Sequence, residues 1–329
     1  MAGIWGNHIL YEHIKHLFRT LTSASVLHNH KKPKMKRRTF LKTASITAVS
    51  ISAFGSISWN GHHFTGSTPT TSDILGPFYR PGAPLRSNIV PVGEDGIPFF
   101  VKGRIFGNDG KTPLHNAIVE AWQCDMDEVY DNTTDDFRYR GRVKTDASGA
   151  YAFQTLMPPP YIVGDDWRPA HIHMRISHDS FQDLITQIYF KGDPNIRIDE
   201  SSSSPDAVER ILEVRQKNES REVLFDIVMQ EYYPLSSEGF NRLEGLYQIE
   251  KGIVEFYREN HLLMMKINGQ IMEGMAYKGN NLFQAANGVN QAEFKVAENG
   301  NVDVLIKMWN YPHREKEPIA FEGTKFMKY

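Results

Sequence analysis

The sequence Asn116-Ala117-Ile118-Val119-Glu120-Ala121-Trp122-Gln123 alternates small aliphatic residues with larger side chains. This period of two is typical of a half-buried β-strand, in which neighbouring side chains point to opposite faces. A helix would instead repeat its apolar residues every three to four positions. The stretch therefore predicts a strand of a sheet that packs one face on a core.

Further strands are expected on both sides of this stretch. Turn signals separate them, including Asn108-Asp109-Gly110 and Asp146-Ala147-Ser148-Gly149. A helix is expected over residues 206–217, where apolar residues recur at helical spacing. Many short strands with regular turns indicate an antiparallel β-sandwich over residues 72–232. The strands expected in it cover residues 98–106, 116–123, 142–145, 150–155, 171–176, 184–190 and 223–229.

A second unit is predicted over residues 240–329. Asn-Gly pairs at 268–269, 287–288 and 299–300 separate several further strand candidates, which cover residues 253–258, 262–267, 270–277, 281–286, 292–296 and 302–308. Because both residues tolerate positive φ, Asn-Gly is a strong signal for tight hairpins. We expect a small antiparallel β-meander or barrel here. It would serve either to bind a ligand or, the interpretation we favour, to pack on the rest of the chain or on a second copy in a homo-oligomer.

Composition limits the classes of function. The 329 residues are 40% hydrophobic and 23% charged, which is typical of a globular protein. The net charge of −2 gives no basic field that would favour a nucleic-acid partner. Cys124 is the single cysteine, so disulfides within the chain and multi-cysteine metal sites are excluded. A transition metal would have to be bound by His, Tyr, Asp or Glu.

Residues 1–59 are interpreted as an N-terminal extension with an export signal, followed by a linker over residues 60–71. The run Lys36-Arg37-Arg38-Thr39-Phe40-Leu41-Lys42 precedes a weakly apolar segment rich in Ser, Thr and Ala, as in twin-arginine signals. That segment is too polar for a stable membrane span. We therefore expect export to the periplasm or the cell exterior. Retention of the uncleaved signal as a membrane anchor is the alternative, and Met35 is an alternative start.

The chemistry is concentrated between Pro158 and His173. His171 and His173 are two residues apart, so on a strand both imidazoles would face the same side and could reach one metal. Tyr161 follows a run of three prolines that stiffens the chain before it. Such a His-x-His pair is only moderately specific for metal when taken alone.

Residues 72–230 contain a series of ordered segments that together are highly specific. They are Gly76-Pro77-Phe78-Tyr79-Arg80-Pro81-Gly82-Ala83-Pro84, Glu120-Ala121-Trp122-Gln123, Thr145-Asp146 with Gly149, Pro160-Tyr161, Asp166 to His173, Gln187-Ile188-Tyr189-Phe190 and Gly192-Asp193-Pro194. On these segments the chain resembles the intradiol ring-cleavage dioxygenases, the family of catechol 1,2-dioxygenase and protocatechuate 3,4-dioxygenase. The resemblance implies a non-haem Fe(III) site that acts on a catechol-type substrate and O2. By position, the ligands it implies are Tyr130, Tyr161, His171 and His173.

The resemblance also implies catalytic roles. Tyr161 would be the ligand that a catechol displaces and would accept a substrate proton. Arg168 would stabilise negative charge on the substrate, and Gln187 would hold Arg168. Tyr139 is the main rival to Tyr130 as a ligand. A ferric ion favours such a site because it is hard and highly charged, and two tyrosinates with one hydroxide balance its charge.

The short segment between Tyr161 and Trp167 departs from well-known members of the family and predicts a more open pocket. The sequence leaves two other functions to compare with this one. A non-catalytic, exported β-sandwich binding module would leave the Tyr and His set unexplained. A zinc hydrolase is disfavoured because tyrosine is a rare zinc ligand and no His-Glu-x-x-His motif is present.

Overall fold

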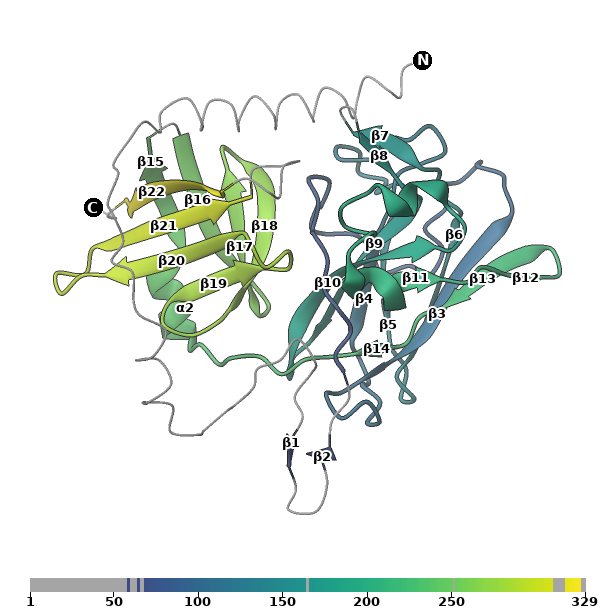
Figure 1. The fold of residues 1–329 in the computed structure, drawn as a ribbon, viewed down its shortest axis with the longest axis horizontal. Coiled ribbons are helices and arrows are strands. Elements are labelled where there is room, and N and C mark those ends of the chain that lie inside the picture. The colour runs from purple at the N-terminus through teal and green to yellow at the C-terminus, as the bar shows by residue number, and fades with distance from the viewer. Residues whose placement is uncertain are drawn as a thin grey trace, which may run out of the picture.

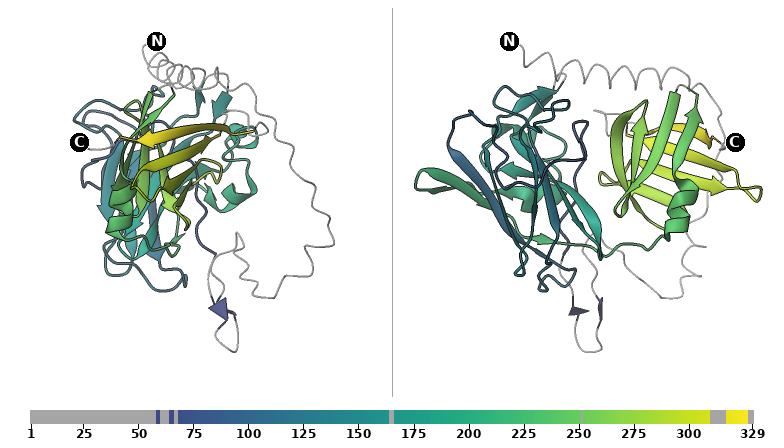
Figure 2. Two further views of the ribbon diagram at one scale, coloured as in Figure 1. Left: turned by 90° about the vertical axis from the view of Figure 1, so that its left-hand side faces the viewer. Right: turned by 180° about the vertical axis from the view of Figure 1, so that it is seen from behind.

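The computed structural model describes residues 58–59, 64–65, 68–163, 166–250, 252–309 and 317–326. Within them the chain forms a two-sheet sandwich and then a closed antiparallel barrel, which lie side by side (Figures 1 and 2). The predicted fold class, mainly β with a small barrel after the sandwich, is confirmed. The predicted export signal lies outside the described residues, apart from β1 (Ser58–Trp59), which pairs with β2 (Phe64–Thr65). Among the described helices, none is long and apolar enough to cross a membrane.

The first sheet of the sandwich holds the sequence element from which the fold was predicted. Its antiparallel strands run in the order β10, β9, β4, β5, and β11 adds to β10 in parallel. Their bounds are β4 (Ile118–Trp122), β5 (Arg140–Lys144), β9 (His171–His178), β10 (Phe181–Phe190) and β11 (Ile211–Leu212).

The second sheet is built around β3 (Pro98–Phe106). β6 (Ala150–Leu156) pairs with β3 antiparallel, whereas β13 (Ser220–Leu224) and β14 (Ile227–Val228) pair with it in parallel. β12 (Arg215–Lys217) continues the sheet beyond β13. A separate hairpin consists of β7 (Tyr161–Val163) and β8 (Asp166–Arg168).

The sandwich core forms where the inner faces of the two sheets meet. Burying each such aliphatic or aromatic side chain contributes about 1.5–3 kcal/mol, so this cluster is the main source of the domain's stability. Its members come from both sheets and include Phe99, Val101, Val119, Ala121, Phe153, Ile172, Met174, Ile176, Ile188 and Val223.

The helix predicted over residues 206–217 is wrong. A short 3₁₀-helix, η3 (Pro205–Arg210), ends where the chain joins the sheet as β11. An earlier 3₁₀-helix, η2 (Pro194–Arg197), follows β10. Arg210 is buried and pairs with Asp73, so the end of η3 is determined by contacts with the sandwich rather than by helix propensity.

The barrel begins after helix α2 (Ser237–Leu243), whose N-cap Ser236 accepts a hydrogen bond from the Gly239 backbone N–H. Pairing of β15 with β22 closes it, and neither of these strands was predicted. Aromatic and aliphatic side chains, among them Phe256, Phe283 and Phe294, fill its interior. The eight strands are β15 (Gly245–Ile249), β16 (Gly252–Glu259), β17 (Leu262–Ile267), β18 (Gln270–Tyr277), β19 (Leu282–Ala285), β20 (Gln291–Val296), β21 (Val302–Met308) and β22 (Ile319–Lys325).

Candidate metal centre

Four buried side chains meet at one end of the first sheet. His171 and His173 lie on β9, and Tyr161 begins β7. Tyr130 lies in the loop between β4 and β5, where the Asp125 carboxylate accepts the backbone N–H groups of Asp127 and Val129 and so bends the chain just before it. At most 3% of each of the four side chains is exposed, so any ion bound there would be shielded from water.

Three atoms of this group form a nearly regular triangle. The hydroxyl oxygens of Tyr130 and Tyr161 and Nε2 of His171 lie 3.3 Å from one another. These contacts are long for hydrogen bonds that involve a hydroxyl, whose usual O···O separation is about 2.7–2.8 Å. The centre of a triangle with 3.3 Å edges is about 1.9 Å from each corner, close to a metal–ligand bond length. The spacing of the three atoms therefore suits coordination of a metal ion better than it suits direct hydrogen bonds between them.

The two histidines are held in different ways. Nδ1 of His171 lies 2.7 Å from the Pro169 carbonyl oxygen, so it donates there and leaves the lone pair of Nε2 facing the triangle. Both ring nitrogens of His173 are buried, and neither has a hydrogen-bond partner among the described residues. Unpaired buried nitrogens are costly, and an additional ligand in the site would relieve that cost.

The electrostatic environment keeps the imidazoles neutral. Burial, and then the nearby charge of Arg168, lower the pKa of His171 to about 3. Burial and His171 also hold the pKa of His173 well below its usual value. A neutral imidazole retains the lone pair that a metal requires. Burial and the neighbouring Tyr161 raise the pKa of Tyr130 above 10, so a nearby cation would be needed to form its phenolate.

Arg168 is held beside this group by two partners. Its Nε donates to Asp199 Oδ1 at 2.7 Å, and one terminal nitrogen donates to Gln187 Oε1 at 3.0 Å. Gln187 in turn donates to the Ile74 carbonyl oxygen at 3.0 Å. In the β7–β8 hairpin Arg168 is the direct cross-strand partner of Tyr161. The structure thus places Gln187 and Tyr161 on either side of Arg168, as direct neighbours of it.

Three further aromatic residues lie outside the triangle. The Tyr139 hydroxyl, the rival to Tyr130, donates to Glu94 instead of reaching the triangle. Trp167 is 42% exposed on the β7–β8 hairpin. Tyr79 lies behind the site, where its ring meets Trp122 edge-on.

Sequence reasoning missed three contributors to the site. Trp122 stacks on His173, and Gly76 lies so close to that ring that an added Cβ would be 2.8 Å from its Cε1 atom. Asp199 anchors Arg168. Gly76 and Trp122 lie in segments that carry the family resemblance, but their contacts depend on pairing across the sheet and on the segment that passes over it. No local pattern singled out Asp199.

A metal site without tyrosine finds no support. Among the described residues, no group of three or more His, Cys, Asp and Glu side chains is placed to hold a metal ion. The side chains that the structure does place beside His171 are Tyr130 and Tyr161, and tyrosine is a rare ligand of zinc.

Comparisons with known proteins point to one family. A protein-family model described as "Dioxygenase" matches residues 74–231. The chain is 37% identical over 145 residues to catechol 1,2-dioxygenase of Candida albicans, covering 37% of this chain and 48% of that protein. It is 33% identical over 146 residues to chlorocatechol 1,2-dioxygenase of Pseudomonas sp. strain P51, covering 39% and 57%. The chain thus spans about half the length of these relatives.

A solved structure is also similar to this chain. It is the dioxygenase domain of a dioxygenase carbohydrate-binding protein fusion from Streptomyces sp. SirexAA-E, with 31% identity and a TM-score of 0.44. The match covers 50% of this chain and 99% of that one. Residues 74–231, which contain the Tyr and His group, thus form a dioxygenase domain that is similar to the intradiol catechol 1,2-dioxygenases.

Proposed function

We propose that this protein is a non-haem Fe(III) intradiol dioxygenase in which Tyr130, Tyr161, His171 and His173 bind the metal. It would insert both atoms of O2 into a catechol-type ring. The bond between the two hydroxyl-bearing carbons breaks and each carbon gains one oxygen atom, so catechol and O2 together account for every atom of a muconic acid. The observation that supports this most directly is the 3.3 Å triangle of donor atoms beside the unpaired imidazole of His173.

The donor set favours ferric iron over softer or less charged metals. Two phenol oxygens and two neutral imidazoles provide hard oxygen and nitrogen ligands without a thiolate. Ionised, Tyr130 and Tyr161 supply two negative charges, and one hydroxide would complete the balance for a trivalent ion. Charge balance matters because the site is buried.

When bound, the ferric ion would hold the two oxygens of the catechol and draw electron density from its ring, which opens a ring carbon to O2. The protein's part is to move protons and to exclude water. Tyr161 would be the ligand that the catechol displaces, because it lies on a hairpin whose strands are only three residues long. Its displaced phenolate would then accept a catechol proton. Tyr130 is more firmly packed, since Phe78 stacks on it at 4.3 Å with the rings 8° from parallel.

Arg168 would stabilise negative charge as it develops on the substrate. Its guanidinium stays protonated throughout the pH range of enzymes. Asp199 and Gln187 already hold it in a fixed orientation, so little reorganisation is needed when the charge appears. Gln187 acts on the substrate only through Arg168.

Turnover under ¹⁸O₂ tests this function. The iron-loaded full-length protein is incubated with catechol, and the product is examined by mass spectrometry. We expect a muconic acid carrying both labelled oxygen atoms from wild type and from Tyr139→Phe, but a loss of orders of magnitude in Tyr161→Phe. Product lacking label, or equal turnover in Tyr161→Phe and Tyr139→Phe, would refute the assignment.

A further inference from the structure

A segment that we call the strap, residues 72–79, runs between the sandwich and the barrel. It precedes β3 in the chain and passes next to the candidate metal centre. Its residues touch three parts of the molecule: the first sheet, the Tyr and His group, and the barrel. The sequence marked part of it, Gly76-Pro77-Phe78-Tyr79, but did not indicate what holds it in place.

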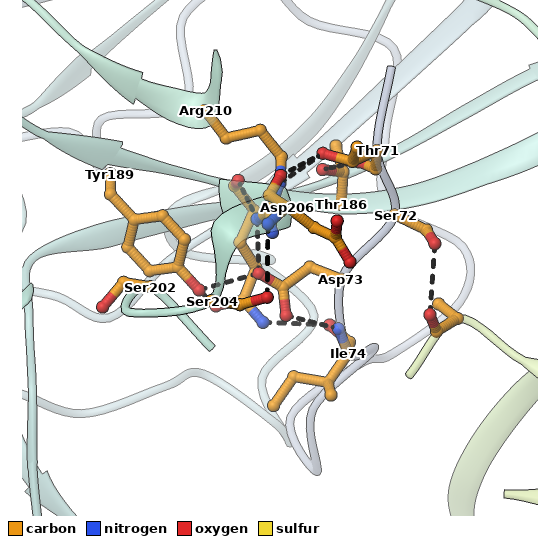
Figure 3. A network of polar contacts seen from close by, with 12 residues as sticks. Thr71, Ser72, Asp73, Ile74, Thr186, Tyr189, Ser202, Ser204, Asp206 and Arg210 are labelled. Carbon is orange, nitrogen blue, oxygen red and sulfur yellow. Dashed lines mark hydrogen bonds and ion pairs between the residues drawn. The ribbon is translucent and has the colours of Figure 1, made fainter. Parts of the chain in front are cut away.

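The sandwich holds the first half of the strap. The Asp73 carboxylate accepts the Tyr189 hydroxyl at 2.8 Å and pairs with Arg210, as Figure 3 shows. The Asp73 backbone N–H donates to the Ile185 carbonyl oxygen at 2.9 Å. These buried, charge-assisted contacts fix the strap at Asp73.

The second half of the strap touches two of the proposed metal ligands. Gly76, at φ +76°, leaves no room for a Cβ because the His173 ring fills that space. Phe78 stacks on Tyr130. His173 has no hydrogen bond among the described residues to orient it, so its ring position is set by packing, in which Trp122 and Gly76 take part. A displacement of this half of the strap would therefore disturb both ligands.

Contacts from the barrel hold this second half. Gln270 on β18 donates to the Pro77 carbonyl oxygen at 3.0 Å, and the Tyr79 hydroxyl donates to Glu259 on β16 at 3.1 Å. The barrel also contacts the start of the strap. There the Ser72 hydroxyl donates to the Ala286 carbonyl oxygen at 3.1 Å (Figure 3).

Apolar packing strengthens the same attachment. Three barrel residues, Leu262, Met264 and Ile271, are buried in one cluster with strap residues and with both tyrosines of the triangle. Removing them would expose that cluster to water, which is unfavourable for each large apolar side chain exposed. The cluster's other members are Leu75, Phe78, Tyr79, Trp122, Cys124, Tyr130, Tyr161 and Ile185.

A charged network fixes the barrel against the sandwich. Arg175 on β9 pairs with both Asp183 and Glu259, and it also donates to the Tyr79 hydroxyl at 2.8 Å. Asn260 donates to the other Asp183 oxygen at 2.7 Å. Arg175 thus balances the charge of Glu259 where Glu259 accepts the Tyr79 hydroxyl. This network supports a barrel that is packed in a fixed position on the sandwich.

We infer that Gln270 and Glu259 of the barrel are positioning residues for the metal centre, acting on His173 and Tyr130 through the strap. The barrel is accordingly a structural part of the site. The identification of His173 and Tyr130 as metal ligands rests on the proposed function, whereas the attachment of the strap does not.

Paired variants of the full-length protein test the inference. Gln270→Ala removes the amide that binds the strap. Its control, Gln284→Ala, removes an amide that binds the Gly288 carbonyl oxygen within the barrel itself. Glu259→Gln is paired with Glu255→Gln, whose carboxylate pairs with Lys266 away from the strap. Two quantities are measured: hydrogen–deuterium exchange of peptides covering residues 72–79 in metal-free protein, and the rate at which a chelator removes iron.

We expect exchange of the strap and loss of iron to be about fivefold to tenfold faster in Gln270→Ala, the effect of one hydrogen bond, and Glu259→Gln to change both in the same direction. Both controls should behave as wild type. Unchanged exchange in Gln270→Ala and Glu259→Gln would overturn the attachment, and faster exchange with unchanged iron loss would overturn the positioning role. Wild-type protein that binds no iron would instead contradict the proposed function, while the exchange data would still decide whether the barrel holds the strap.

Discussion

The indole of Trp122 lies flat against the imidazole of His173, with ring centroids 5.1 Å apart and planes 8° from parallel. The two residues are direct neighbours across β4 and β9, so the sheet register produces this stack. Since neither His173 nitrogen has a hydrogen-bond partner among the described residues, the stack is a principal restraint on its ring. The restraint is apolar and leaves both nitrogens available to a ligand.

Trp122→Leu should loosen His173. The variant loses the flat surface behind the imidazole and also a large buried side chain, which costs about 2–4 kcal/mol of stability. We expect its iron-to-protein ratio after dialysis against a chelator to fall well below that of wild type. Trp167→Leu, at an exposed indole, is the matched control and should retain iron. Equal retention in both variants would show that the stack does not matter to the site.

Gly76→Ala should abolish metal binding. Two effects combine: an L-residue at positive φ costs about 1–2 kcal/mol, and the new methyl group would displace the His173 ring. Gly93→Ala separates the backbone cost from the clash with His173. Gly93 also has positive φ, +88°, but a Cβ added there would meet nothing within 4 Å. Urea unfolding should reveal a similar backbone cost in both variants, with iron lost only from Gly76→Ala. Iron retention by Gly76→Ala at wild-type level would contradict the proposed geometry.

Arg168→Lys should separate metal binding from turnover. Lysine keeps the positive charge but cannot donate to Asp199 and Gln187 in the same fixed fork. We expect normal iron content and a fall in kcat of about 10²-fold, the usual effect of removing one preorganised charge stabiliser. Arg215→Lys, on the exposed edge strand β12, should change neither quantity. Full activity in Arg168→Lys would exclude the proposed role of the guanidinium.

Glu273 inside the barrel should make stability depend on pH. Burial raises its pKa to about 7 despite the hydrogen bond that Asn290 donates to it. A folded-state pKa above the unfolded value means that folding favours the protonated carboxyl. Its contribution is therefore complete below about pH 4.5 and is lost as the pH rises through 7.

Glu273→Gln keeps an acceptor for Asn290 but cannot ionise. Its Tm should consequently exceed that of wild type at pH 8 by more than at pH 4.5. Glu293→Gln, at an exposed position on the barrel, controls for the loss of a carboxylate. A Tm difference between Glu273→Gln and wild type that does not change with pH would show that Glu273 does not titrate in this range.

Local pattern was sufficient for most strands. The predicted strand over residues 98–106 has the bounds of β3, and those over 262–267, 270–277 and 302–308 match β17, β18 and β21. Alternation and Asn-Gly turns are local signals, so they can be read without the tertiary structure. β15 and β22 were missed because their pairing joins the two ends of the barrel sequence.

The candidate site divides in the same way. The His-x-His spacing on a strand could be read directly, whereas Tyr161 and Arg168 were implied by the family resemblance, and the structure brings Tyr161, His171 and Arg168 together. The supports of the site could not be read. Gly76 reaches His173 across nearly a hundred residues of sequence, and Gln270 reaches Pro77 from another domain, so neither contact leaves a periodic signal.

The measurement that tests the central claim most directly is the visible absorption spectrum of purified, iron-supplied protein, recorded without oxygen before and after catechol is added. We predict a broad tyrosinate-to-iron charge-transfer band that shifts to longer wavelength when catechol binds. A protein that stays colourless after both ferric and ferrous iron have been supplied would contradict the account.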